Sequence, residues 1–180
     1  MSFVRSQGTG KMRVEIRSAE ERDLPAINSI YNHYVVHATC TYQFKPETAE
    51  SRLEWFRRRG EKHPVTVAEI GGEVVGWGSL NVFNGREAYS WTVENSVYVH
   101  PEWQRRGVGR AVLEDLIARA RGLGHRTIIA GISAEQSASV ALHEALGFTK
   151  VGHLREVGYK FGQWLDVVTY QLLLERPALD

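Results

Sequence analysis

One segment of the sequence, residues 96–110, limits what this chain can fold into more than any other stretch. It begins with Val97, Tyr98 and Val99, which are β-branched or aromatic and favour a strand. Pro101 then ends the strand, because proline cannot donate to a sheet ladder. A basic turn follows, and the helix after it repeats apolar residues at helical spacing: Val112, Leu113, Leu116 and Ile117. The segment therefore predicts a strand, a glycine-containing turn and a helix in direct succession.

The turn between that strand and that helix has the features of an anion-binding site. Gly107 and Gly109 have no Cβ, so a phosphate group can approach the backbone closely. The first N–H groups of a helix are free, and the helix dipole favours negative charge there. Arg105, Arg106 and Arg110 add positive charge. Neither the Walker nor the Rossmann glycine spacing is present, so the pattern favours a pyrophosphate bound without a metal.

The composition is that of an ordinary globular domain. The 180 residues are 43% hydrophobic and 24% charged with a net charge of +1, which gives no reason to expect nucleic-acid or membrane binding. The one cysteine, Cys40, excludes an intrachain disulfide and suits a reducing, cytoplasmic setting. The histidines show no ligand spacing, so no metal is expected. We expect a single domain over residues 12–180, and a disordered extension or start-site artefact over residues 1–11.

Hydrophobic periodicity predicts helices interleaved with a strand-rich middle. Strands are expected at 13–17, 65–70, 73–80, 89–99, 127–132, 151–159 and 164–174. Helices are expected at 24–36, 48–59, from the glycine-rich turn to about 122, and at 137–146. Asp23 and Thr48 are the expected N-caps, Gly71 and Gly72 a hairpin turn, and residues 94–95 a β-bulge. This order predicts a mixed sheet with helices on both faces.

A second motif, residues 142–148, lies on the last predicted helix and reads Leu-His-Glu-Ala-Leu-Gly-Phe. Together with the Gln-Arg-Arg-Gly-Val-Gly turn at 104–109, it resembles the GNAT acetyltransferase superfamily, whose members carry both motifs at about this separation. Five blocks narrow the resemblance to the phosphinothricin and methionine-sulfoximine N-acetyltransferase branch. These blocks are residues 31–35, 86–89, 92–99, 142–144 and 158–167.

The resemblance implies a GNAT-type α/β fold, with a mixed, mostly antiparallel central sheet flanked by helices on both faces. It also implies acetyl-CoA as co-substrate, with the pantetheine arm along Val97, Tyr98 and Val99. The pyrophosphate is expected at Arg105, Arg106, Gly107, Val108, Gly109 and Arg110. The family's asparagine after the fifth strand corresponds here to Gln136, which has a longer reach, and Ser139 is expected to contribute.

Acyl transfer from a thioester to an amine needs groups that move protons and stabilise charge. Glu94 is the candidate base that accepts the proton of the amine, and the alternative is a surface carboxylate or a salt-bridge partner. A free N–H at the expected bulge before Val99 could stabilise an oxyanion. His143 occupies the position where many GNAT enzymes have a tyrosine acid, and it is either a proton donor or a packing residue.

The acceptor is expected to be the α-amino group of a small amino-acid-like compound such as phosphinothricin, methionine sulfoximine or methionine sulfone. Arg86 could hold its carboxylate or tetrahedral group, unless it is a solvated loop arginine. Tyr31, Phe44, Trp91 and Tyr159 are candidate pocket walls. Alternatives are an acetyltransferase for protein N-termini or other amines, and a non-catalytic acyl-CoA-binding module. The resemblance also implies a homodimer.

Overall fold

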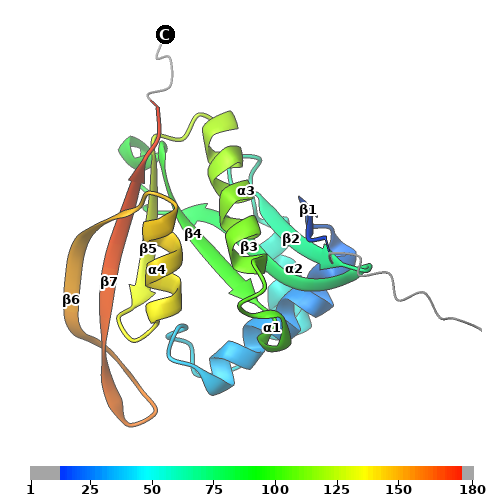
Figure 1. Cartoon of the computed structure of the whole chain (residues 1–180), viewed down its shortest axis with the longest axis horizontal. Coiled ribbons are helices and arrows are strands. Elements are labelled where there is room, and N and C mark those ends of the chain that lie inside the picture. The colour runs from blue at the N-terminus through cyan, green and yellow to red at the C-terminus, as the bar shows by residue number, and fades with distance from the viewer. Residues whose placement is uncertain (1–12, 176–180) are drawn as a thin grey trace, which may run out of the picture.

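The computed structural model describes residues 13–175, within which seven strands are joined by helices and short turns (Figure 1). The strands are β1 Glu15–Ser18, β2 Val65–Ile70, β3 Glu73–Val82, β4 Thr92–Val99, β5 Thr127–Ser133, β6 Thr149–Lys160 and β7 Gln163–Leu173. The helices are α1 Leu24–His37, α2 Ala49–Arg57, α3 Val108–Gly122 and α4 Ser137–Ala145. Short 3₁₀ turns span Glu21–Asp23, Glu87–Tyr89 and Pro101–Trp103. The expected extension over residues 1–11 lies outside the described residues.

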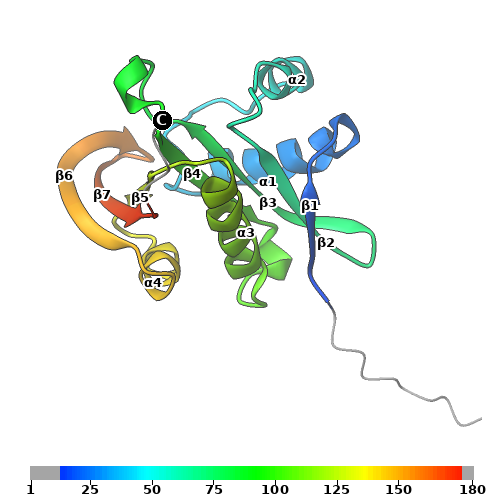
Figure 2. The same cartoon turned by 90° about the horizontal axis from the view of Figure 1, so that it is seen from above.

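The strands form one sheet in the order β1-β2-β3-β4-β5-β7-β6. Every neighbouring pair is antiparallel except β4 and β5, which run parallel. Helices α3 and α4 cover one face and α1 and α2 cover the other, as the view from above shows (Figure 2). The predicted mixed, mostly antiparallel sheet with helices on both faces is therefore confirmed.

Two separate apolar clusters hold these layers together. The larger one packs α3 against the sheet, with Val112, Leu113 and Leu116 fully buried. The smaller one packs α1 against the opposite face, where Ile27 and Trp77 meet. Among residues 13–175, no helix is both long and apolar enough to cross a membrane.

Strand β4 departs from the sequence-based expectation in two ways. It begins at Thr92 rather than at residue 89, because residues 87–89 form a 3₁₀ turn. The predicted bulge at residues 94–95 is wrong: the register between β3 and β4 runs unbroken from Val82↔Val93 to Gly76↔Val99. Instead, β4 pairs with β5 only over residues 92–94, so the two strands separate beyond Glu94 (Figure 1). Polar residues interrupt the apolar alternation at this point of separation.

The capping predictions have mixed outcomes. The Thr48 hydroxyl accepts a hydrogen bond from the Ser51 N–H at 3.1 Å, which confirms Thr48 as the N-cap of α2. Asp23 precedes α1, but its side chain caps nothing in that helix. Its carboxylate instead accepts hydrogen bonds from the Arg17 guanidinium and from the Glu20 N–H of the preceding turn. The ion pair with Arg17 has replaced the cap.

Gly78 in β3 sets how closely α3 can approach the sheet. An ideal Cβ there would lie 2.6 Å from Val112 Cγ1 and 2.8 Å from the Ser96 carbonyl oxygen. We expect Gly78→Ala to lower the free energy of unfolding by about 1–3 kcal/mol, because the backbone oxygen cannot yield easily. Urea denaturation measures the change. Gly85→Ala is the matched control, since a Cβ at Gly85 meets nothing within 4 Å. Equal stability of both variants would contradict the packing argument.

Candidate functional site

The separation of β4 from β5 leaves backbone groups of β4 without a neighbouring strand. The His100 N–H donates to the Val75 carbonyl, so His100 is hydrogen-bonded to β3. Along an antiparallel ladder every second residue is hydrogen-bonded to the neighbouring strand, and the residues between them face the other side. The backbone groups of Val97 and Val99 therefore point away from β3, toward the gap. Those of Tyr98 point to β3, and its side chain stacks on Trp77 on the α1 face. The structure thus supports Val97 and Val99 as an edge for an extended ligand, whereas the backbone of Tyr98 is directed to β3 and not to this edge.

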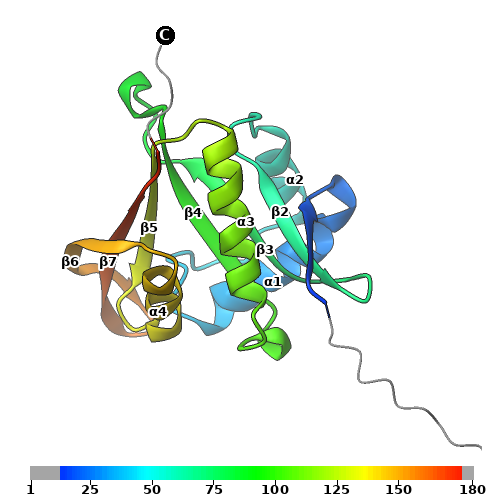
Figure 3. The same cartoon turned by 45° about the horizontal axis from the view of Figure 1, so that its top comes forward.

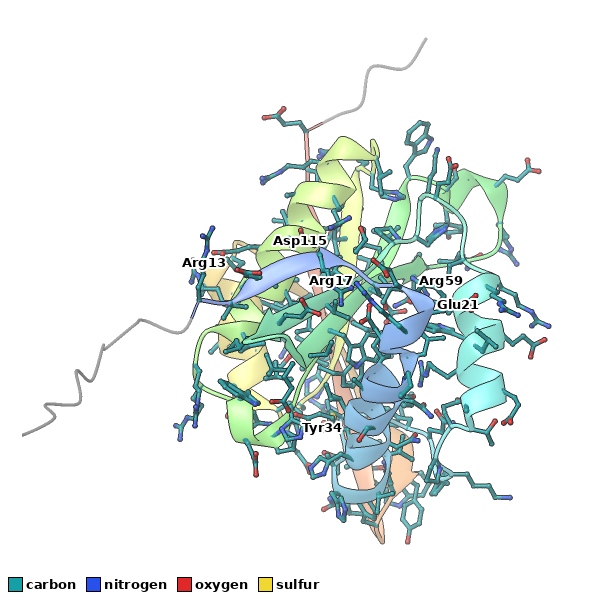
Figure 4. All side chains as sticks on the ribbon, turned by 90° about the vertical axis from the view of Figure 1, so that its right-hand side faces the viewer. Arg13, Arg17, Glu21, Tyr34, Arg59 and Asp115 are labelled. Atoms are coloured by element: carbon teal, nitrogen blue, oxygen red, sulfur yellow. The ribbon has the colours of Figure 1, made fainter. Side chains whose placement is uncertain are left out.

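Tyr34 closes one end of this edge. Its hydroxyl donates to the Val99 carbonyl and accepts from Gln104 Nε2 at 2.8 Å. The side chain projects from α1 toward the end of β4 (Figure 4). The Val99 carbonyl is consequently engaged, whereas the Val99 N–H and both backbone groups of Val97 face the gap.

The turn after β4 presents a concave run of backbone N–H groups. Arg105 has a φ of 59° and Gly107, the N-cap of α3, has a φ of 85°. The first intrahelical bond runs from the Ala111 N–H to the Gly107 carbonyl, so the N–H groups of residues 108–110 have no partner within the helix. Left-handed residues next to a helix N-terminus create such anion-binding concavities.

Three elements meet at a glycine of this turn, and side chains around it supply charge. A Cβ at Gly109 would lie 3.4 Å from Val99 and 3.5 Å from Leu142, so β4, α3 and α4 converge on a glycine. Arg110 pairs with Glu114 at 2.8 Å, while the Arg106 guanidinium lies over the Trp103 ring. Free N–H groups, arginines and a glycine at the point of convergence fit the pyrophosphate and pantetheine of acetyl-CoA. We call residues 105–110 the cradle.

Gln136 and Ser139 lie at the N-terminus of α4, the helix that follows β5 and lies beside α3 on one face of the sheet (Figure 3). Gln136 is the N-cap residue, but its side chain makes no capping bond and instead reaches Thr39 Oγ1 at 3.5 Å. The carbonyl of Ser139 receives a hydrogen bond from His143. In this arrangement the Gln136 amide is directed toward the segment after α1 rather than along α4.

Glu94 stands where the two strands begin to separate. One carboxylate oxygen lies 3.2 Å from the position of a Cβ on Gly131, so the side chain leans over β5. Within residues 13–175 no cation forms a salt bridge with it. Burial raises the pKa of the Glu94 carboxyl above its ordinary value. A desolvated carboxylate without a counterion is suited to accept a proton, and the salt-bridge alternative finds no support.

His143 is only 3% exposed, and both of its ring nitrogens are engaged. Nδ1 lies 2.8 Å from the Ser139 carbonyl oxygen, which can only accept, so Nδ1 carries the proton. Nε2 then accepts from the Asn95 amide at 3.0 Å. Burial lowers the pKa of His143, which favours the neutral ring. This geometry favours the packing role over the proton-donor role.

We therefore expect His143→Gln to affect stability more than the pH dependence of catalysis. Loss of the two hydrogen bonds should lower the free energy of unfolding by about 1–3 kcal/mol. Burial lowers the pKa of His143 in the folded state, so the unfolded state binds the proton first as the pH falls. The wild type therefore loses stability below about pH 6.5, the ordinary pKa of histidine. Urea unfolding and kcat/KM measured across pH check both points. Disappearance of an alkaline limb in the rate profile would instead restore His143 as an acid.

A cavity of about 210 Å³ lies beside Glu94, between the sheet and α1 and α2. Its aromatic walls are Tyr31, Trp55, Trp77 and Tyr98. Its polar walls are Glu47, Arg52, Ser79, Asn81 and Ser96. Asn81 Nδ2 donates to the backbone carbonyl of Glu94 at 3.3 Å, so the cavity wall reaches the backbone of the candidate base.

Only one of the five predicted substrate residues, Tyr31, lines this cavity. Phe44 is 71% exposed in the loop between α1 and α2, and Tyr159 is exposed in the β6–β7 hairpin. Arg86 and Trp91 lie in the exposed segment before β4. The structure does not bring these four side chains to the cavity, since each of them is exposed outside it.

Arg52 is the cavity residue that the sequence reasoning missed. It is 5% exposed, and burial lowers the pKa of its guanidinium. A signal was present in the sequence: Arg52 precedes Trp55 and Phe56 by three and four residues, on the apolar side of α2. An arginine on the buried side of an amphipathic helix is a candidate for a functional charge.

Comparison with known proteins agrees with this geometry. The L-methionine sulfoximine/L-methionine sulfone acetyltransferase of Salmonella typhimurium is 40% identical, over 91% of this chain and 96% of its own. The phosphinothricin N-acetyltransferase of Streptomyces viridochromogenes is 38% identical, over 92% and 90%. A GNAT superfamily phosphinothricin acetyltransferase from Sinorhizobium meliloti, solved with acetyl-CoA, superposes with a TM-score of 0.87 at 36% identity, over 93% and 94%. Residues 27–148 match the acetyltransferase (GNAT) family, and the chain belongs to that family.

Proposed function

We propose that this protein transfers acetyl from acetyl-CoA to the α-amino group of a small amino-acid-like acceptor. The observation that carries the proposal is the position of Glu94, the last residue of β4 that pairs with β5, whose backbone is hydrogen-bonded to Asn81 in the wall of the 210 Å³ cavity. The acetyltransferase relatives named above act on compounds of this class. Acetyl-CoA supplies an activated thioester, and the chain positions it and removes the proton of the amine.

Each group of this chain has a distinct task in the proposed reaction. The cradle binds the pyrophosphate through the N–H groups of residues 108–110 and through Arg105 and Arg106. Val97 and Val99 align the pantetheine arm as a neighbouring strand would, and their N–H groups can donate to developing charge. Glu94 accepts the proton of the amine, directly or through water. No acid role is assigned to His143.

A thiol-release assay tests the proposal most directly. Acetyl-CoA is offered with L-methionine sulfone, L-methionine sulfoximine, phosphinothricin, polyamines and peptides as acceptors. We expect release with the amino-acid-like compounds and much slower release with polyamines and peptides. Preference for peptides would favour an N-terminal acetyltransferase. Tight acetyl-CoA binding without release for any acceptor would favour a non-catalytic module and end the proposal.

We also propose that two copies of the chain associate through the β6–β7 hairpin. This hairpin exposes large apolar side chains, among them Leu154, Val157, Phe161 and Trp164, the last of them 62% exposed. Several large apolar side chains exposed on one hairpin are typical of an interface. Sedimentation velocity should give the mass of two chains for the wild type and of one for Leu154→Glu combined with Trp164→Glu.

We propose a reducing, cytoplasmic setting for the protein, which the single cysteine supports.

A further inference from the structure

Arg52 is a buried cation without a carboxylate partner in residues 13–175. Its one side-chain hydrogen bond there runs from Nε to Asn28 Oδ1 at 3.2 Å. This bond orients the guanidinium and leaves its two terminal nitrogens without a protein acceptor among those residues. Retaining a charge at 5% exposure without an ion-pair partner costs free energy. A bound anion would remove that cost.

Aromatic rings surround the Arg52 guanidinium. Its central carbon lies 4.5 Å from the centroid of the Tyr31 ring and 4.8 Å from that of Trp55. Stacking of this kind stabilises the cation and fixes the plane of its fork without occupying the in-plane donors. The guanidinium is therefore held in place while its terminal N–H groups remain available to a ligand.

The other charged residue in the cavity wall, Glu47, lies near Arg52, but its carboxylate is held by other donors. The Glu47 carboxylate accepts hydrogen bonds from Gln43 Nε2 at 2.7 Å and from the Ser51 hydroxyl, and it forms no ion pair with Arg52. The buried indole nitrogen of Trp77 also lacks an acceptor among the described residues. The cavity thus contains N–H donors that an anionic group could use. None of these donors is paired with a carboxylate among the described residues.

We propose that Arg52 binds the α-carboxylate of the acceptor in the cavity between α1, α2 and the sheet. A carboxylate matches the planar guanidinium fork and can take two parallel hydrogen bonds. At about 210 Å³ the cavity is smaller than the roughly 300–1,000 Å³ of pockets for drug-sized ligands, and it suits an amino acid. Ser96 lines it two residues beyond Glu94 on the same face of β4, which brings the amine near the base. The inference rests on the proposed acetyl transfer to amino acids and specifies what selects them.

The test compares L-methionine sulfone with 3-(methylsulfonyl)propylamine, the same compound without its carboxylate. In Arg52→Met, we expect kcat/KM for the sulfone to fall about 30- to 100-fold, mainly through KM. For the decarboxylated amine we expect less than about a threefold change, because no carboxylate contact is lost. Arg58→Met is the matched control on the same segment, since Arg58 is exposed and pairs with Glu54. Equal losses for both acceptors in Arg52→Met would overturn the assignment.

Two further measurements keep the outcome decisive. If Arg52→Met does not bind acetyl-CoA, the variant has not folded, and Arg52→Lys replaces it. In Arg52→Lys we expect kcat/KM for the sulfone to fall at least about fivefold, with no such loss for the decarboxylated amine. Calorimetric titration of the sulfone into the wild type with CoA separates binding from turnover. Arg52-dependent binding without acetylation would contradict the proposed function and support the carboxylate site. Absence of binding in the wild type would overturn the site.

Discussion

Replacing Glu94 with glutamine should lower kcat/KM by roughly 10²–10⁴-fold, because glutamine cannot accept the proton of the amine. The wild-type rate should rise with pH as Glu94 loses its proton. Since burial raises the pKa of this carboxyl, the rise should occur above the ordinary glutamate range. The acid limb should be absent from the Glu94→Gln profile. Stopped assays from pH 5 to 9 with saturating acetyl-CoA measure both effects.

Glu61→Gln is the control for this experiment, because Glu61 is an exposed residue in the turn before β2. It should leave the rate and the pH profile unchanged. Acetyl-CoA affinity should be the same in Glu94→Gln and in the wild type, since Glu94 does not belong to the cradle. If Glu94→Gln keeps the acid limb, another group takes the proton and Glu94 has only a structural role.

Removing both arginines that precede the α3 N-terminus should weaken acetyl-CoA binding by about 100-fold, since each can make a charge-assisted hydrogen bond to phosphate. The double variant Arg105→Ala/Arg106→Ala tests this expectation. The KM for acetyl-CoA should rise and kcat should change little, because neither side chain reaches the reacting atoms in the proposed arrangement. Calorimetric titration with CoA at two salt concentrations should show a smaller salt dependence in the variant.

Arg121→Ala offers a control with a similar local setting, because Arg121 lies at the opposite end of α3 and is exposed. Its replacement should not alter CoA affinity. A loss of kcat in the double variant at saturating acetyl-CoA would show that the cradle also aligns the thioester. If the double variant binds CoA as tightly as the wild type, the backbone N–H groups alone bind the pyrophosphate.

The sequence predicted the strand–turn–helix unit and most elements because their signals are local. Gly71 and Gly72 have positive φ angles of 61° and 83°, as a tight hairpin requires, and Thr48 caps the helix that follows it. The break at residues 94–95 was misread as a bulge, because a polar interruption has the same pattern when two strands separate. The difference is tertiary: β4 loses its partner β5 beyond Glu94, and the next residue, Asn95, hydrogen-bonds to His143, forty-eight residues later.

The acceptor side was harder to predict than the cradle. The helical spacing of Arg52 from Trp55 and Phe56 places it on the apolar side of α2, but this local pattern does not state what that side of the helix contacts. Burial depends on how α2 docks against the sheet, which brings Arg52 over Tyr31 and Trp55. The tautomer and neutrality of His143 likewise follow from two partners that only the fold provides.

The separation of β4 from β5 also has a thermodynamic consequence. Beyond Glu94 the sheet consists of two parts, β1–β4 and β5–β7, which share the α3-side core but no direct ladder. A ligand that fills the gap hydrogen-bonds to one part and packs against the other, so it adds to the cohesion of the whole fold. At a concentration 100 times its Kd, such a ligand stabilises the native state by about 2.7 kcal/mol. Substitutions far from the gap that alter how the two parts pack should therefore change co-substrate affinity and thermal stability together.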